Sequence, residues 1–411
     1  MSEVNLTRIY LDHAATTPVR PEVLQTMLPM LGQTFGNPSS FYKTGRDARH
    51  VLENARTTLA GCIHADPSEI YFTSCGTESD NWAIKGTALA LQKKGRHIIT
   101  TRIEHHAVLH SCESLARQGY DITWLDVDAD GLVDPEAVRA AIRPDTVLVT
   151  IMMANNEIGT VQPIGEIAAI CHEKKVLLHS DAVQAAGALP IDVRSLGADM
   201  LSFSGHKLYA PKGVGALYLR RGVRIANFMD GGAQERNRRA GTENVASIAG
   251  FARAFELAAA ELPDNAARLS AMRDDFISKV LARIPHTRLN GHPLNRLPNN
   301  VNLSFEFIEG ESILLMLDHY GYECSSGSAC TSGSLDPSHV LLAIGLPHEI
   351  AHGSLRVTLG HSNTSGQLDA MVDALEGIVQ RLRDMSPLYE AYLKHETCEL
   401  AGDGLVACST R

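Results

Sequence analysis

Residues that could take part in chemistry follow most of the strand-like runs in this chain, at the points where those runs end. In a parallel sheet such points gather at one edge, and ligands bind outside the carboxyl ends of the strands. We therefore expect these residues to surround one ligand. They are Gly76, Thr77, His105, Asn156, Asp181, Gln184 and Lys207.

Several of these residues each suit one part of a single ligand. Gly76 lets the backbone approach a ligand closely, and Thr77 can cap the helix that starts there, so that the helix N-terminus faces an anion. His105 could lay its ring on a flat cofactor. Asp181 follows an apolar strand, where a carboxylate without a cation would be costly to bury. Lys207, if desolvated, forms a Schiff base with an aldehyde.

Taken singly, these positions also have plain structural explanations. Gly76 and Thr77 fit an ordinary helix start, His105 fits a capping or surface residue, and Lys207 fits a side chain that reaches solvent. Taken together they match pyridoxal phosphate, which has a phosphate, a flat ring, a ring nitrogen and an aldehyde. An aspartate that keeps the ring nitrogen protonated makes the ring withdraw electrons from the substrate carbon.

The runs that must position these residues alternate with helical segments. This alternation predicts an α/β fold with a mostly parallel, seven-stranded sheet and helices on both faces. We expect an antiparallel strand at one edge, because only a Pro/Gly-rich loop separates the last two runs. The runs lie at 69–74, 97–101, 121–127, 146–153, 175–181, 198–204 and 214–220.

After Gly241 the pattern changes. A long helix is expected over 242–262, followed by a smaller α+β region with strands near 299–305 and 354–359 and helices near 310–318 and 364–383. We predict a large domain over 15–260 and a small domain formed by 1–14 and 261–411. Periodicity is weak after residue 384, and the end of the chain is expected to be frayed.

Composition excludes several classes of function. Of 411 residues, 44% are apolar and 20% are charged, as in ordinary globular proteins. The net charge of −10 argues against a nucleic-acid or anionic-membrane partner. The sequence has neither a signal-peptide pattern nor an apolar run long enough to span a membrane. Eight cysteines are too few for a disulfide scaffold, which predicts a reducing, cytoplasmic location.

Family-specific motifs extend this reading. The chain closely resembles the cysteine desulfurases, the NifS/IscS-like group of class-V aminotransferase relatives with the fold-type I architecture of pyridoxal phosphate enzymes. The matching stretches cover nearly the whole chain to about residue 360. They are YLDHAATTP, FGNPSS, TSCGTESDN, EHHAV, NNEIGTVQPI, DAVQAAG, SFSGHKLYAPKGVG, RRAGTENV, SSGSACTSGSLDPSHVLLAIGL and LRVTLG.

The resemblance implies an enzyme that converts L-cysteine to L-alanine and loads the sulfur onto Cys330 as a persulfide. It implies that Lys207 forms the Schiff base, that His105 stacks on the ring and that Asp181 holds the ring nitrogen. Arg356 would bind the substrate carboxylate, and Asn156 would also contact the substrate. The phosphate would be bound by Gly76, Thr77, Ser204, His206 and, from the partner subunit of a homodimer, Thr242. The ring substituents would be contacted by Asn156 and Gln184.

The segment SSGSACTSGS, residues 325–334, explains the setting of Cys330. About four small residues on each side give the thiol a reach of roughly 13 Å at ~3.3 Å per residue, and glycine and serine keep such a tether flexible. The loop over about 321–335 is therefore interpreted as a swinging arm. It would attack the substrate sulfur and then carry the persulfide to an iron–sulfur scaffold or another acceptor. No resident metal is expected, although Cys330 could transiently ligate an iron–sulfur cluster.

The other cysteines leave questions open. Cys75 and Cys324 stand where the family has small non-thiol residues, and no role is assigned to Cys398 or Cys408. We expect Cys324 to be half buried and a poor nucleophile. The motif CTSGS, with Gly333, leans toward the nitrogenase-associated NifS type.

Two rival functions differ from this interpretation. Within the same cofactor chemistry, the chain could be a selenocysteine lyase or another β-lyase. Outside it, the chain could be a sulfur or metal carrier that uses Cys324, Cys330, His339 and His348, a spacing that matches no compact zinc pattern.

Overall fold

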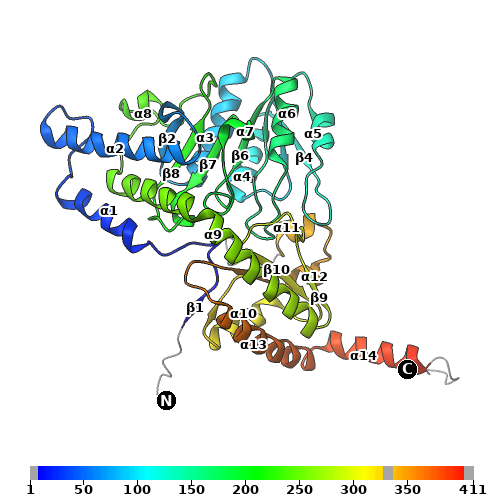
Figure 1. Ribbon diagram of the computed structural model, residues 1–411. Coiled ribbons are helices and arrows are strands. Elements are labelled where there is room, and N and C mark those ends of the chain that lie inside the picture. Colours follow the sequence, from blue (N-terminus) through cyan, green and yellow to red (C-terminus); the bar gives the residue numbers. More distant parts are fainter. Residues whose placement is uncertain (1–7, 327–336, 402–411) are drawn as a thin grey trace.

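A seven-stranded sheet forms the centre of the larger part of the molecule (Figure 1). The computed structural model describes residues 8–326 and 337–401, with the backbone alone for 396–401. The strand order is β2-β8-β7-β6-β5-β3-β4, so the predicted α/β class is confirmed. The strands are β2 (Ile70–Thr73), β3 (His97–Thr101), β4 (Asp121–Leu125), β5 (Thr146–Thr150), β6 (Leu177–Asp181), β7 (Met200–Ser204) and β8 (Gly215–Leu219).

Strand β8 is antiparallel to both of its neighbours, β7 and β2, whereas the other strand pairs of this sheet are parallel. One edge of the sheet is therefore antiparallel, as expected, although the antiparallel strand β8 lies one position in from that edge. The short loop after β7 does return the chain antiparallel beside it, but β2 pairs with the other side of β8 and becomes the edge. The carboxyl ends of β2, β3, β5, β6 and β7 consequently share one end of the sheet.

Helices cover both faces of the sheet. In β2, Ile70 and Phe72 join one apolar core and Tyr71 joins the core on the opposite face, because successive strand side chains point to opposite sides. Burial on both faces explains why these strands read as continuous apolar runs. The helices are α1 (Pro21–Gly32), α2 (Lys43–Cys62), α3 (Gly76–Leu91), α4 (His106–Ala116), α5 (Pro135–Ala141), α6 (Ile164–Lys174), α7 (Val193–Leu196) and α8 (Gln234–Asn237).

Helix α9 (Val245–Arg283) leaves the sheet and runs into a second apolar core. The expected helix ended at 262, and Pro263, just beyond that point, costs the helix interior a hydrogen bond. The helix nevertheless continues. Its first half, including Phe251, packs in the sheet core, and its second half, including Phe276, packs in the other core. Burial of both halves offsets the cost of the proline.

The second core is enclosed by a three-stranded antiparallel sheet and helices. The expected strands and helices are present, and Thr287–Leu289 adds a short strand that the sequence did not predict. Leu11 also belongs to this core. The division at residue 260 stays a prediction. The elements are β9 (Thr287–Leu289), β10 (Asn300–Phe305), β12 (Ser354–Thr358), α10 (Gly310–His319), α13 (Ser365–Asp384) and α14 (Pro387–Ala401), with the pair β1 (Ile9–Tyr10) and β11 (Tyr322–Glu323) alongside.

Two short helices complete the smaller region, α11 (His339–Ala343) and α12 (His348–His352). Helix α14 occupies much of the stretch after residue 384 in which the sequence showed weak periodicity. None of the helices in the described ranges combines the length and apolar character needed to cross a membrane.

Candidate active site

The turn between β2 and α3 forms a helix start without a side-chain cap. Helix α3 begins at Gly76, and the residue before it, Cys75, makes no capping hydrogen bond through its side chain. The expectation that Thr77 caps this helix was wrong, because Thr77 lies inside the first turn. Glu78 instead reaches back and accepts a hydrogen bond from the Ser74 N–H at 2.8 Å, which shapes the turn. The first N–H groups of α3 are thus left for an anion.

Ser204, at the end of β7, lies against this helix start. A Cβ atom at Gly76 would come within 2.8 Å of Val183 Cγ2 and 3.3 Å of Ser204 Cβ, so only glycine fits. The Ser204 hydroxyl is buried and has no hydrogen-bond partner among the described residues. A buried hydroxyl without a partner is costly. These features together match a cradle for a phosphate group.

Lys207 and Gln184 converge on the backbone of the segment after β1. Lys207 Nζ donates to the carbonyl oxygens of Ala14 at 2.5 Å and Ala15 at 2.7 Å, and Gln184 Nε2 donates to Ala14 O at 3.0 Å. His206, beside Lys207, has its Nδ1 3.2 Å from Thr16 Oγ1. The structure thus brings these predicted site residues to one place.

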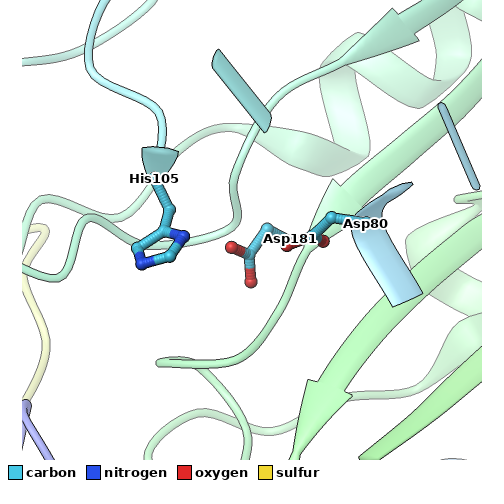
Figure 2. Close-up of side chains that lie close together, drawn as sticks. All are labelled: Asp80, His105 and Asp181. Atoms are coloured by element: carbon cyan, nitrogen blue, oxygen red, sulfur yellow. The ribbon is translucent and has the colours of Figure 1, made fainter. Parts of the chain in front are cut away.

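Asp181 and His105 lie close together at the same sheet edge (Figure 2). One carboxylate oxygen of Asp80, one of Asp181 and one ring nitrogen of His105 all lie within 4.8 Å of one another. Burial raises the pKa of Asp181 to about 6, against the opposing effects of the Val183 N–H and the Lys207 charge. The pocket therefore suits a carboxylate that faces a cation, which for the expected ligand is the protonated ring nitrogen.

His105 is neutral across the physiological pH range. Burial, with a contribution from the nearby charge of Lys207, lowers its pKa to about 4. Its Nδ1 accepts a hydrogen bond from the Ala107 N–H at 3.1 Å as the cap of α4. His105 can therefore cap α4 and also face a ligand, because the capping hydrogen bond holds its ring beside Asp181.

Arg356 lies on β12 and contacts groups from distant parts of the chain. Its Nη2 donates to Asp12 Oδ1 at 2.7 Å, and its Nη1 donates to the Asn156 carbonyl at 3.1 Å. Arg356 is buried. A buried guanidinium fixed on two sides is a rigid binding group for a carboxylate.

The segment that contains Cys330 lies outside the described residues, but the residues on either side of it are placed. Ser325 pairs with Arg356 in an antiparallel bridge, with the Arg356 N–H 2.6 Å from the Ser325 carbonyl. At the other end, the Ser338 hydroxyl donates to Glu157 at 2.5 Å. Both flanks therefore lie at the Arg356 and Asn156 side of the site.

The thiol of Cys324 matches expectation. It is half buried, and burial raises its pKa well above the ordinary range. Burial also raises the pKa of Cys62 to about 11 and that of Cys171 to about 12. Cys75 is half buried, and Cys408 lies outside the described residues. Thiols with raised pKa values are poor nucleophiles.

Thr242 was expected to serve the site of a partner subunit. It lies exposed just before α9, and its side chain makes no hydrogen bond to another described residue. Its predicted role, through a partner subunit, stays a prediction.

Three groups near the site were not assigned by sequence reasoning. Asp12 orients Arg356, Arg239 forms a two-pronged ion pair with Glu78 at 2.7 and 3.0 Å, and Asp80 lies beside Asp181. Each belongs to a motif stretch, YLDHAATTP, RRAGTENV or TSCGTESDN. A charged residue inside such a motif was the signal available, but its partner could not be identified without the fold.

The residues present fit pyridoxal phosphate. The uncapped start of α3 and the unpartnered Ser204 hydroxyl suit its phosphate, Asp181 suits its ring nitrogen, His105 suits its ring face and Lys207 suits its aldehyde. Gln184 lies close enough to Lys207 to share the Ala14 carbonyl with it.

Comparisons with known proteins agree with this arrangement. The chain matches the family model described as aminotransferase class-V over residues 9–371. It is 56% identical over 380 residues to the cysteine desulfurase IscS of Methanosarcina thermophila, covering 92% of this chain and 94% of that protein. It is 51% identical over 391 residues to the cysteine desulfurase IscS of Clostridium botulinum, covering 95% and 98%.

Solved structures show the same likeness. A NifS-like protein aligns with a TM-score of 0.86 and 38% identity, covering 92% of this chain and 100% of that one. A structure described as SspA in complex with cysteine aligns with a TM-score of 0.77 and 38% identity, covering 86% and 99%.

Proposed function

The chain belongs to the class-V aminotransferases and, within them, to the cysteine desulfurases, and on that premise we propose that it uses pyridoxal phosphate to convert L-cysteine to L-alanine. The sulfur is left on Cys330 as a persulfide. The observation that carries the cofactor assignment is the unpartnered Ser204 hydroxyl beside the uncapped start of α3. It lies at the sheet edge that also holds Asp181 and Lys207.

The binding residues divide between cofactor and substrate. Pyridoxal phosphate, when bound, withdraws electrons from the α-carbon of the amino acid. Asp181 supplies the negative charge that holds the ring nitrogen in its protonated form, and His105 packs on the ring as a neutral imidazole. Arg356 binds the substrate carboxylate, and its bonds to Asp12 and to the Asn156 carbonyl fix its direction.

Lys207 moves the proton at the substrate's α-carbon, and Cys330 accepts the sulfur. The thiolate of Cys330 attacks the sulfur of bound cysteine, so that an S–S bond forms while the substrate's C–S bond breaks. The carbon keeps the electron pair of the broken bond and takes up a proton, which yields alanine. The persulfide sulfur then passes to an acceptor, for which we propose an iron–sulfur scaffold protein. The cytoplasmic location expected from the sequence remains a prediction.

The active form is proposed to be a homodimer in which Thr242 reaches the partner's phosphate cradle. Two observations support this. Thr242 is exposed just before α9, and helix α1 exposes Leu24, Leu28 and Leu31 along one face. An exposed apolar stripe of this kind suits a second copy of the chain.

The assignment of the nucleophile is tested by two matched variants, Cys330→Ala and Cys324→Ala. After one anaerobic turnover with L-cysteine, alanine is quantified and the extra sulfur is located by peptide mass spectrometry. We expect Cys330→Ala to form neither alanine nor persulfide, and Cys324→Ala to keep most of both, because its thiol is protonated. Sulfur found on Cys324 would refute the assignment. Pyruvate and free sulfide in place of alanine would instead indicate a β-lyase.

The shared site is tested by mixing two variants, Lys207→Ala and Thr242→Ala. A mixed dimer contains one site with both native residues only if Thr242 serves the partner. The cofactor affinity of that site should return to the wild-type value, whereas the Thr242→Ala homodimer should lose the ~0.5–1.5 kcal/mol of a hydrogen bond. An unrestored site, or a fully active monomer in light scattering, would contradict the proposal.

A further inference from the structure

A second carboxyl group lies beneath Asp181, and the proposed reaction does not use it. Asp80, on helix α3, is buried, and its Oδ1 has no hydrogen-bond partner among the described residues. In Figure 2, Asp181 lies between His105 and Asp80. One carboxylate oxygen from each aspartate and one ring nitrogen of His105 lie within 4.8 Å of one another. Two buried aspartates so close together raise the question of where their charges reside.

Two carboxylates at this separation cannot both be ionised cheaply. In a buried site their repulsion is poorly screened, and such a pair holds one proton between its members near neutral pH. Asp181 has the Val183 N–H at 2.9 Å and the Lys207 charge to stabilise its anion. Asp80 has neither, and burial together with the Asp181 charge raises its pKa well above the ordinary value. The proton therefore belongs on the Asp80 side of the pair.

One other residue could take that proton. His179 Nε2 lies 3.6 Å from Asp80 Oδ1, so an imidazolium paired with an ionised Asp80 would carry the same total charge. The His179 ring is already engaged on both sides, by Thr150 Oγ1 at 2.8 Å and Ser202 Oγ at 2.9 Å. A neutral imidazole satisfies both hydroxyls, and burial lowers the pKa of His179 to about 3.

The remaining groups around Asp80 do not supply a compensating cation. Glu104 is a third buried carboxyl, and burial raises its pKa to about 8. It accepts hydrogen bonds from the Met152 N–H at 3.0 Å and the Thr101 hydroxyl at 2.7 Å. The Cys75 thiol is close enough to interact electrostatically with Asp80, and it offers no positive charge. The Ser202 hydroxyl favours the ionised form of Asp80, but burial and the neighbouring Asp181 charge outweigh it, so an uncharged Asp80 is the favoured state.

We propose that Asp80 is a positioning residue that retains the proton of a buried carboxyl pair, so that Asp181 alone presents a negative charge to the bound ring. This inference rests on the proposed function and deepens it. A single negative charge balances the single positive charge of a protonated ring nitrogen beside the buried side chains of Asp80 and Asp181. An ionised Asp80 would add a second charge that the ring cannot neutralise.

The proton is tested directly on the apoprotein by infrared spectroscopy at pH 7, with aspartate labelled with carbon-13 at the side-chain carboxyl. The label separates aspartates from Glu104. We expect a band from a protonated aspartate in the wild type that is absent from Asp80→Asn. No such band in the wild type, or a band that persists in Asp80→Asn, would overturn the proposal.

The consequence for the ligand is tested by the dissociation constant of pyridoxal phosphate, measured by equilibrium dialysis. Asp80→Asn replaces a neutral acid by a neutral amide of the same shape, so its affinity should stay within about threefold of the wild type. Asp181→Asn should bind at least about tenfold more weakly, because a charge-assisted bond is lost. A tenfold loss in Asp80→Asn, with an unchanged melting temperature, would show that the Asp80 charge matters and overturn the proposal.

Failure of the proposed function would look different. A wild-type chain that binds pyridoxal phosphate but forms no alanine from L-cysteine would contradict the function, whereas the infrared band and the affinities of the two variants would still decide the state of Asp80.

Discussion

Replacing Ser204 by alanine should make the apoprotein more stable and the binding of pyridoxal phosphate weaker. The hydroxyl is buried, and no described residue shares a hydrogen bond with it. Without the cofactor it is therefore a desolvated polar group that the folded state must tolerate. In the proposed complex with the cofactor it would donate a hydrogen bond to the phosphate. The Ser204 hydroxyl thus lowers the stability of the apoprotein but should raise its affinity for the cofactor.

The magnitudes follow from the two environments. An unsatisfied buried hydroxyl costs about 1–3 kcal/mol, so its removal should raise the melting temperature of the apoprotein by about 1–3 °C for a chain of this length. A hydrogen bond to a charged phosphate is worth about 1.5–3 kcal/mol, so the dissociation constant should rise about 10- to 150-fold.

The assay combines thermal unfolding of the apoprotein with equilibrium dialysis of pyridoxal phosphate. Thr100→Val is the matched control, because Thr100 on β3 also has a buried hydroxyl without a described partner but is not among the cofactor-binding residues assigned above. It should stabilise the apoprotein without changing the affinity. A Ser204→Ala apoprotein that is less stable, or an affinity within twofold of the wild type, would refute the assignment of Ser204 to the phosphate cradle.

Two further predictions concern substrate binding and acid stability. Asp12→Ala should raise the KM for L-cysteine about 5- to 30-fold, the equivalent of ~1–2 kcal/mol, because Arg356 loses the carboxylate that lies 2.7 Å from its Nη2. The affinity for the cofactor should not change. An unchanged KM would contradict this role of Asp12. His179 has a folded pKa of about 3, so below pH ~6.5 the unfolded chain takes up a proton that the folded chain does not, and stability falls with pH by up to about 1.4 kcal/mol per unit. His179→Gln should lose this part of the pH dependence of thermal stability between pH 6.5 and 5, whereas a variant of the exposed His319, His319→Gln, should behave as the wild type. The same change of melting temperature with pH in all three proteins would argue against a neutral buried His179.

Local patterns were sufficient to predict much of the fold. Each strand of the large sheet is buried on both faces, so its residues form an apolar run that stands out between helical segments. Because parallel strands end at one edge, the polar residues after the runs could be assigned to one site before any contact was known. Asp181, Lys207 and His105 were assigned to the candidate site in this way.

Local patterns gave wrong helix ends where the prediction depended on one residue and its neighbours in sequence, without the tertiary contacts of the helix. The helix expected over 242–262 continues through Pro263 to Arg283, because packing of α9 in two cores outweighs the hydrogen bond that the proline removes. Thr77 looked like a cap because its residue type is a common one, yet Glu78 shapes the turn and moves the helix start to Gly76.

The sequence by itself determined which residue types gather at the carboxyl ends of the strands, since strand periodicity arises from burial along one short segment. Only the tertiary structure decided which of them meet. Asp12 and Arg356 are 344 residues apart, and Asp80 comes to lie beneath Asp181 only because α3 packs against the sheet. Such contacts depend on the summed packing of both cores, and no single segment carries that information.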